Sequence, residues 1–474
     1  MKQKTSIKQR VGGAGRSPKK NRKIKVLVAM SGGVDSSVAA LLMKQKGYEV
    51  IGAFMKNWSD TKNDLGECTW KQDRQEAIKI ASLLKIPLIT LDFEKEYRKL
   101  VVDEMFKLYK KGITPNPDID CNQKIKFPLL RKAAKKLGAK FVVTGHYVRI
   151  KDVKIDENYV RSVKLRSQTA KNNKKSLSII NSKNKSASDS EQEINYSEGR
   201  AGGKSSFRLL RAKDETKDQS YFLYRLNQED LKHSLFPIGD YTKKQIREIA
   251  KKHKFPNAER KGTVGICFIG KVNLKKFLQK KIKPKKGKIL NPEREQIGEH
   301  DGIYYYTIGQ KIGPHFGIDI LKKGNDKKQL KRWYIARKNL RKNEIIAAPE
   351  GHKILYRKEI TIKQPHWIND DLVKDLFGKK DNVNKIRSMT NVKDSKVNLK
   401  LAFGRAGGTD NIYSIKLHAR IRQVGELLPC KLTYNKTKKQ FKVTLRKPIT
   451  GVSEGQAIVL YKGKETLGGG VIGF

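Results

Sequence analysis

The sequence contains no long apolar run, few cysteines and few acidic residues. No apolar stretch approaches the ~18–20 residues of a membrane-spanning helix, and the first residues lack the apolar segment of a signal peptide. These absences predict a cytoplasmic protein with no membrane partner. The four cysteines are too widely spaced for a zinc framework, so we expect no metal site from them: Cys68, Cys121, Cys267 and Cys430. In a reducing compartment such cysteines are either buried or reactive.

The shortage of acidic residues leaves a large positive charge. The 474 residues include 104 Lys and Arg against 47 Asp and Glu, which gives a formal net charge of +57. Solubility does not require this much charge, and it indicates a polyanionic partner, of which nucleic acid is the first candidate. A general lysine bias is the alternative, because many of the lysines form no motif. Residues 1–23 are basic and aperiodic, and we expect a disordered tail there.

Apolar runs alternate with amphipathic ones from Ile24 onward. The pattern predicts these elements: strand 25–30, helix 35–46, strand 50–55, helix 71–85, strand 88–92, helices 94–110 and 121–137, and strand 141–144. This order is typical of a parallel α/β sheet. Ligands of such sheets collect at the carboxyl ends of the strands, so we expect Ser31–Ser36, Met55 and Thr144–His146 to converge on one crevice.

The remaining sequence predicts two further domains. Residues 220–283 are mostly helical in pattern, most clearly from Tyr241 to His253. Later residues form short alternating runs, beginning with Ile303–Ile308, which turn residues separate, and this predicts an antiparallel β-barrel. The expected organisation is a tail 1–23, a catalytic domain 24–219 with a flexible insertion 151–206, a central domain 220–287, and a barrel 288–474 with an insertion 370–412.

A glycine turn, Met30 to Ser37 (MSGGVDSS), follows the first strand and opens the first helix. Its glycines let the backbone approach an anion, toward which the first-turn N–H groups and the helix dipole point. The spacing fits neither GxxxxGK[ST] nor GxGxxG. It is typical of the SGGxDS pyrophosphate loop, in enzymes that split ATP between its α- and β-phosphates. A plain turn with an Asp or Ser N-cap is the alternative.

The segment Thr114–Asn122 (TPNPDIDCN) has two prolines that stiffen a loop before the next helix. We expect Cys121 in the first helical turn, where the helix dipole and nearby Lys124 favour the thiolate. Cys121 could equally be a small buried apolar residue. Asp118 could be an N-cap or a general base, and its position does not decide between them.

Two further residues carry weaker signals. Cys267 lies in GICFIG (265–270), where apolar neighbours raise a thiol pKa, so the local context alone favours a structural role. His146 ends a strand over the expected crevice, a position that is more often functional than structural.

Together these motifs resemble the bacterial tRNA-specific 2-thiouridylases. The motifs occur in the family's order: the pyrophosphate loop, FMKNW (54–58), TPNPDIDCN, TGHYVR (144–149), KDQSY (217–221), GICFIG and LGGG (467–470). The resemblance spans about residues 24–474 apart from the insertions. It implies an adenine nucleotide alpha hydrolase-like domain, a small central domain and a C-terminal barrel.

The resemblance also implies site residues. ATP, with Mg²⁺ assisting at the phosphates, would be bound by Ala29, Met30, Ser31, Gly32, Gly33, Val34, Asp35, Ser36, Met55 and Gly145. The flipped-out wobble uridine would be held by Asn116, Pro117 and Asp118. The tRNA would be contacted by His146, Lys217, Asp218, Gln219, Arg420, Ile421 and Gln456.

In the chemistry that the resemblance implies, AMP is transferred to O2 of the uridine. Cys267 then carries sulfur as a persulfide, supplied by an upstream relay protein, while Cys121 releases it and Asp118 acts as acid or base. Local departures from the family pattern are Lys261-Gly262-Thr263, Lys271 and Ile421. Two alternatives remain: another pyrophosphate-loop enzyme of tRNA modification, which would leave both cysteines idle, or a non-catalytic RNA-binding protein.

Overall fold

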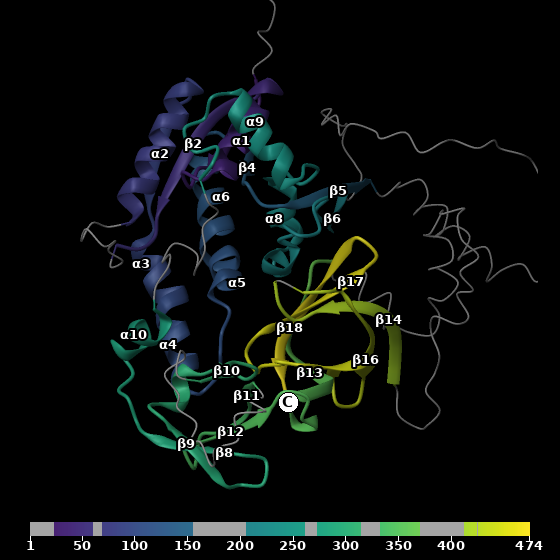
Figure 1. The fold of residues 1–474 in the computed structure, drawn as a ribbon. Coiled ribbons are helices and arrows are strands. Elements are labelled where there is room, and N and C mark those ends of the chain that lie inside the picture. Colours follow the sequence, from purple (N-terminus) through teal and green to yellow (C-terminus); the bar gives the residue numbers. More distant parts are fainter. Residues whose placement is uncertain are drawn as a thin grey trace, which may run out of the picture.

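The computed structural model describes residues 23–59, 69–154, 205–260, 273–313, 332–369, 412–423 and 425–474. Cys68 and Cys267 lie outside the described residues, as do the predicted tail and nearly all of the two predicted insertions. The described chain forms three β-sheets with helices around the first (Figure 1). None of its described helices is long and apolar enough to cross a membrane.

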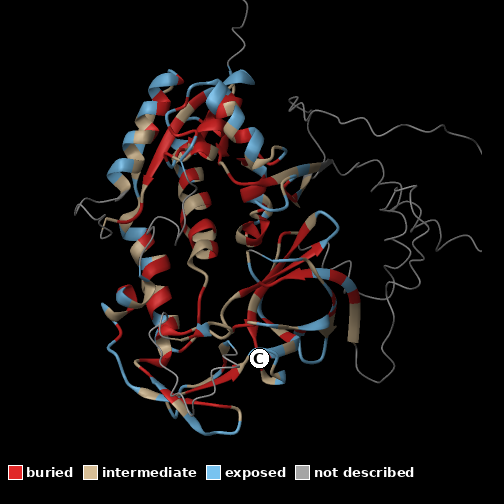
Figure 2. Cartoon of the chain, viewed as in Figure 1, coloured by how far each residue is buried: buried red, intermediate tan, exposed pale blue. Residues whose placement is uncertain are grey.

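The N-terminal sheet is parallel, as predicted. It runs in the order β3-β2-β1-β4-β7. Its strands are β1 (Lys25–Ala29), β2 (Glu49–Lys56), β3 (Leu88–Asp92), β4 (Phe141–Val143) and β7 (Ser234–Leu235). The last of these comes from the predicted central domain and pairs with β4. Val26, Leu27 and Val28 are fully buried, because helices cover both faces of the sheet (Figure 2).

Alternate residues of the strands enter two different cores. Val26 and Val28 pack with α1 (Val34–Gln45), α2 (Thr69–Leu83) and α9 (Lys243–Lys252). Leu27, between them, faces the other side, where it shares a core with α4 (Asp103–Lys110) and α6 (Phe127–Lys136). The period of two therefore fixes which face each helix covers.

Each of the two predicted helices on this second face contains a π-helical turn. The first runs as α3 (Glu94–Tyr97), η1 (Arg98–Val102) and α4. The second runs as α5 (Pro117–Cys121), η2 (Asn122–Lys126) and α6, so it begins four residues before the predicted start at 121. The prediction was wrong because Asn116 caps this helix, its side chain accepting from the Ile119 N–H at 3.4 Å. Pro117 then occupies the first turn, where its missing N–H costs nothing.

Residues 287–349 form a separate five-stranded sheet. The order is β10-β11-β12-β8-β9. Its strands are β8 (Gly287–Leu290), β9 (Gln296–His300), β10 (Lys311–Ile312), β11 (Trp333–Asn339) and β12 (Glu344–Pro349). The run Ile303–Ile308, predicted as a strand, starts with the 3₁₀ turn η4 (Ile303–Tyr305) instead. A short apolar run does not distinguish a strand from a packed turn. This sheet shares a core with α4 and α10 (Leu274–Gln279).

Six C-terminal strands close into the predicted antiparallel barrel. They are β13 (Tyr356–Trp367), β14 (Ile412–Arg420), β15 (Leu428–Asn435), β16 (Gln440–Thr450), β17 (Ala457–Lys462) and β18 (Glu465–Gly473). Pairing of β13 with β18 closes the ring. Side chains at Gly468 and Gly469 would strike the carbonyls of His366 and Ile458, so the LGGG motif serves the barrel's closure.

A hairpin joins the barrel to the first domain. It consists of β5 (Val148–Lys154) and β6 (Ser205–Arg211), which flank the first predicted insertion. β6 also pairs with β18, at Glu465 opposite Leu210. The hairpin follows β4 directly in the chain, yet it extends the sheet of the barrel (Figure 1).

Candidate active site

The glycine turn connects the end of β1 with the N-terminus of α1. Gly33 is the N-cap of α1 and makes no side-chain capping bond, so the alternative of an Asp or Ser N-cap is wrong. The Ser36 and Ser37 hydroxyls each donate to the Gly33 carbonyl at 2.9 Å. Gly32 has φ +76°, and a side chain there would strike the Asp73 carbonyl. The turn thus presents uncapped helix N–H groups in a backbone shape that requires glycine.

The Asp35 carboxylate in the first turn of α1 is held from two sides. Lys243 of α9 places Nζ 2.6 Å and 2.8 Å from its two oxygens. The Tyr147 hydroxyl donates to Asp35 Oδ1 at 2.7 Å. Burial, followed by the Asp35 charge, raises the pKa of Tyr147, so its hydroxyl remains a donor. Sequence reasoning missed Lys243, because nothing in the local pattern of α9 distinguishes it from its neighbours.

Two further residues, which sequence reasoning missed, fix the backbone of the turn. Asn257 is buried, and its Nδ2 donates to the Gly32 carbonyl at 2.9 Å and to the Ser37 hydroxyl at 3.0 Å. Arg260 contacts the same Gly32 carbonyl at 3.4 Å and forms an ion pair with Asp73. Neither residue belongs to a recognisable motif, so the sequence carried no signal for them.

The end of β4 approaches the turn, as predicted from the parallel sheet. A side chain at Gly145 would come within 2.7 Å of the Ser36 nitrogen and 2.8 Å of the Asp35 carbonyl carbon. Met55 lies near the end of β2, which pairs with β1 on the side opposite β4, and its side chain is buried in the core. The assignment of these residues to ATP stays a prediction.

Cys121 is fully buried at the end of α5. It belongs to the same core as Trp58 and Tyr97. It is the fifth residue of the helix, not a residue of the first turn. Lys124 Nζ lies 3.3 Å from the Asp120 carboxylate, with which it forms an ion pair, and the stabilisation of a Cys121 thiolate stays a prediction.

The structure excludes one of the two roles that the sequence allowed for Asp118, N-cap or general base. Asn116 occupies the N-cap, so Asp118 lies inside the first turn and its N-cap role is wrong. Its role as a general base stays a prediction, as does the sulfur chemistry of Cys121. Cys267 cannot be placed relative to either residue, because it lies outside the described part of the chain.

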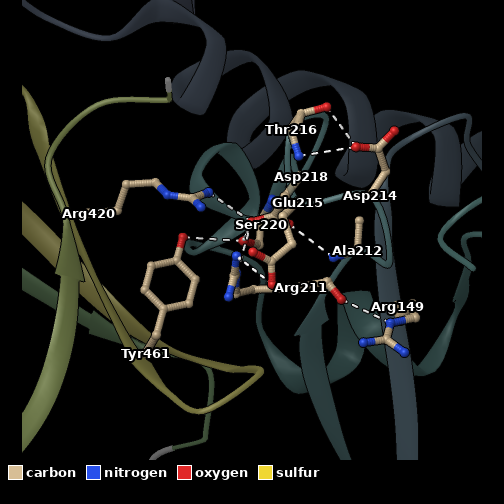
Figure 3. Close-up of polar contacts among 10 residues, drawn as sticks. All are labelled: Arg149, Arg211, Ala212, Asp214, Glu215, Thr216, Asp218, Ser220, Arg420 and Tyr461. Carbon is tan, nitrogen blue, oxygen red and sulfur yellow. Dashed lines mark hydrogen bonds and ion pairs between the residues drawn. The ribbon is translucent and has the colours of Figure 1, made fainter. Parts of the chain in front are cut away.

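Two of the predicted tRNA contacts face each other in a buried ion pair (Figure 3). Asp218 Oδ2 lies 2.8 Å from Arg420, and both side chains are at most 4% exposed. Asp218 also accepts from the Ser220 hydroxyl at 2.9 Å and from the Ala212 N–H at 3.1 Å. Arg211 adds a second guanidinium at 3.6 Å. This network joins the segment after β6 to strand β14 of the barrel.

The other predicted tRNA contacts are also largely turned inward. His146 is buried, with Nδ1 2.7 Å from the Thr144 hydroxyl, and burial, followed by the charge of Lys126, lowers the pKa of His146 well below its usual value. Ile421 is buried, and the partly exposed Gln219 accepts from the Tyr147 N–H at 2.9 Å. Gln456 donates to two carbonyls of the Thr114–Pro115 segment. Of the seven residues, only Lys217 is exposed. Direct tRNA contact by these residues stays a prediction.

The described residues offer no ready metal site. Within the described ranges, no three His, Cys, Asp or Glu side chains cluster in a way that could hold a metal ion. The carboxylate nearest the turn, Asp35, is already engaged by Lys243 and Tyr147.

Three family models match consecutive parts of the chain. They are described as the tRNA methyl transferase HUP domain (residues 24–271), the tRNA methyl transferase PRC-barrel domain (275–349) and the aminomethyltransferase beta-barrel domain (408–472). The second range contains all five strands of the five-stranded sheet, and the third contains barrel strands β14 to β17 and nearly all of β18 but not β13.

Relatives match over nearly the full length of the chain. The tRNA-specific 2-thiouridylase MnmA of Nitrosomonas europaea is 33% identical over 95% of this chain and 98% of its own. The protein of the same name from Lactobacillus johnsonii is 34% identical over 95% and 96%, respectively. That from Coxiella burnetii (strain CbuK_Q154) is 35% identical over 94% and 95%.

Proposed function

The chain belongs to the tRNA-specific 2-thiouridylase (MnmA) family, and we propose that it uses ATP to convert the wobble uridine of tRNA to 2-thiouridine. The observation that carries this proposal is the uncapped N-terminus of α1, to which the glycine turn and Gly145 give close access. An anionic phosphate fits such a site without further charged ligands. The net charge of +57 supports a tRNA partner. A tRNA substrate would place the protein in the cytoplasm.

In the first step, O2 of the uridine attacks the α-phosphorus of ATP, and pyrophosphate leaves as the bond to the β-phosphate breaks. Backbone N–H groups of the turn and of α1 would bind the phosphates and stabilise the charge that develops on them. Asp35 would hold the turn in shape through Lys243 and Tyr147. The uridine would be flipped out of the anticodon, because C2 of a stacked base is hard to reach.

In the second step, a persulfide on Cys267, loaded by a sulfur-relay protein, supplies sulfur to C2, and AMP leaves with the former O2. Cys121 then attacks the Cys267 sulfur, which forms a disulfide and releases the transferred sulfur from the protein. A thiol reductant restores both cysteines. The burial of Cys121 supports a reaction that excludes water, and it requires α5 to be held accurately beside the uridine.

In the proposed reaction, Mg²⁺ would bind together with the phosphates of ATP. Mg²⁺ usually keeps several waters and is bound by phosphates with one or two carboxylates. Among the described residues, no three His, Cys, Asp or Glu side chains cluster to hold such an ion without the phosphates.

The test is mass spectrometry of tRNA nucleosides after incubation with ATP, a persulfide donor and a thiol reductant. We expect 2-thiouridine and pyrophosphate with the parent chain, and neither product with Asp35→Asn. Asp240→Asn is the matched control, since its carboxylate is 71% exposed and pairs with Arg149. Pyrophosphate without 2-thiouridine would favour another pyrophosphate-loop enzyme. Binding of tRNA with neither product would favour the non-catalytic alternative.

A further inference from the structure

The loop between β16 and β17 contacts the segment that leads into α5. Gln456 Nε2 donates to the carbonyl oxygens of Thr114 and Pro115, at 2.9 Å each. The Thr114 N–H donates back to the Glu454 carbonyl at 3.4 Å. At Gly455, φ is +89° and a side chain would come within 2.8 Å of the Thr114 oxygen. The barrel loop and this segment are therefore in backbone-to-backbone contact.

The same part of the barrel also holds the first turn of α5. The Tyr221 hydroxyl lies within donating distance of two carbonyl oxygens, at 3.1 Å from that of Ala457 and 3.3 Å from that of Ile421. Ile119, within α5, packs with Tyr221 and Ala457 in one buried cluster. The helix start is thus fixed from outside its own domain.

Gln456 has no donor left for a nucleic acid. A glutamine amide carries two N–H donors, and two carbonyl oxygens lie within hydrogen-bond distance of this nitrogen. A phosphate or a base acceptor would have to compete with both. This geometry differs from the tRNA contact that the family resemblance implies for Gln456.

We propose that Gln456 is a positioning residue, which holds the Thr114–Pro115 carbonyls and thereby sets the position of α5 for the reaction. The two residues whose carbonyls Gln456 binds come directly before Asn116, the N-cap of the helix that carries Asp118 and Cys121. Pro115 and Pro117 stiffen the connection, so a displacement at the carbonyls would be passed on to the helix. The inference rests on the proposed function for its kinetic test, but not for its structural test.

The experiment compares Gln456→Met with Gln228→Met. Methionine keeps the side chain's length and removes the amide. Gln228 is a matched control, because its Nε2 also donates to two carbonyls at 2.9 Å, those of Phe207 and Ile368, far along the chain from α5. We expect Gln456→Met to lower kcat for thiolation by roughly 10-fold to 100-fold with the tRNA Kd unchanged within about twofold. We expect Gln228→Met to keep the parent kcat.

A second variant tests rescue. Gln456→Lys returns N–H donors on a long side chain, so it should recover most of the lost kcat. A raised tRNA Kd with an unchanged kcat in Gln456→Met would overturn the inference in favour of a tRNA contact. Equal losses of kcat in Gln456→Met and Gln228→Met would assign Gln456 a general structural role instead.

Hydrogen exchange gives a reading that is independent of activity. The N–H groups of Ile119 and Asp120 bond to Asn116 at the start of α5. In the protein without tRNA, their exchange should be faster in Gln456→Met and unchanged in Gln228→Met. If the parent made no 2-thiouridine, the proposed function would fail while this measurement still decided the inference. Unchanged exchange in Gln456→Met would refute it.

Discussion

The buried pair of Asp218 and Arg420 allows the most quantitative prediction. Removing one partner of a buried ion pair leaves an uncompensated charge and costs about 3–5 kcal/mol. In Arg420→Met, Asp218 keeps the Ser220 and Ala212 donors and Arg211 at 3.6 Å, so we expect the lower end, about 3 kcal/mol. In Asp218→Asn, two guanidinium groups lose their shared carboxylate, so we expect the upper end, about 5 kcal/mol.

The double variant Asp218→Asn/Arg420→Met removes both charges together. Its cost should fall short of the sum of the single costs by at least about 2 kcal/mol, because contacting residues are coupled. The control is Glu359→Gln, which breaks the barrel's Lys442–Glu359 pair, whose side chains are 45% and 57% exposed. Exposed pairs contribute only about 0–1 kcal/mol.

Hydrogen exchange of the amides in β14 and β17 is the appropriate assay. It reports the free energy of opening of the barrel itself and does not require the whole chain to unfold in one step. Single-variant losses no larger than that of Glu359→Gln, or strictly additive losses in the double variant, would refute the reasoning.

Three further predictions concern single residues. Because the pKa of folded His146 lies below the unfolded value near 6.5, its neutral form contributes fully to the free energy of unfolding above about pH 6.5. Below that pH the free energy of unfolding should fall by about 1.4 kcal/mol per pH unit. His146→Gln should lack this loss in thermal unfolding, and an equal loss in the variant would contradict the assignment. Asp35→Asn should retain tRNA binding in gel shifts while losing pyrophosphate release; parallel loss of both would reduce the turn to a structural role. Burial raises the pKa of the Cys430 thiol to about 12, so iodoacetamide at pH 8 should not alkylate it in the native protein. Cys430→Ser should convert tRNA uridine to 2-thiouridine at the parent rate. Rapid alkylation of Cys430 detected by mass spectrometry would contradict the prediction.

Local sequence patterns were sufficient to predict the parallel sheet and the antiparallel barrel. Val26 to Val28 are apolar in succession because both faces of β1 are covered, and the glycines at 32 and 33 mark the turn that follows. The start of α5 was missed because the two prolines around Asn116 suggested a loop that continued to Cys121. Proline in a first helical turn is compatible with a helix, and only the capping geometry of Asn116 identifies the boundary.

The partners within the candidate site could not be predicted. Lys243 contacts Asp35 across 208 positions of sequence, and Gln456 contacts Thr114 across 342. No periodicity or spacing links such pairs, because the fold alone brings them together. The same reason explains Asp218 and Arg420: the family resemblance implied that both contact tRNA, whereas in the structure the two side chains form an ion pair with each other.

The pairing of β6 with β18 has a consequence for synthesis on the ribosome. Arg208 and Glu465, which lie on these two strands and form an ion pair, are separated by 257 positions. At ~5–20 residues per second, translation of the intervening chain takes roughly 13–50 s. During that time the first domain can fold, but one edge of β6 has no strand to pair with. An unpaired edge can recruit a strand from another chain, so nascent chains that stall before residue 465 should be the form of this protein most prone to aggregate.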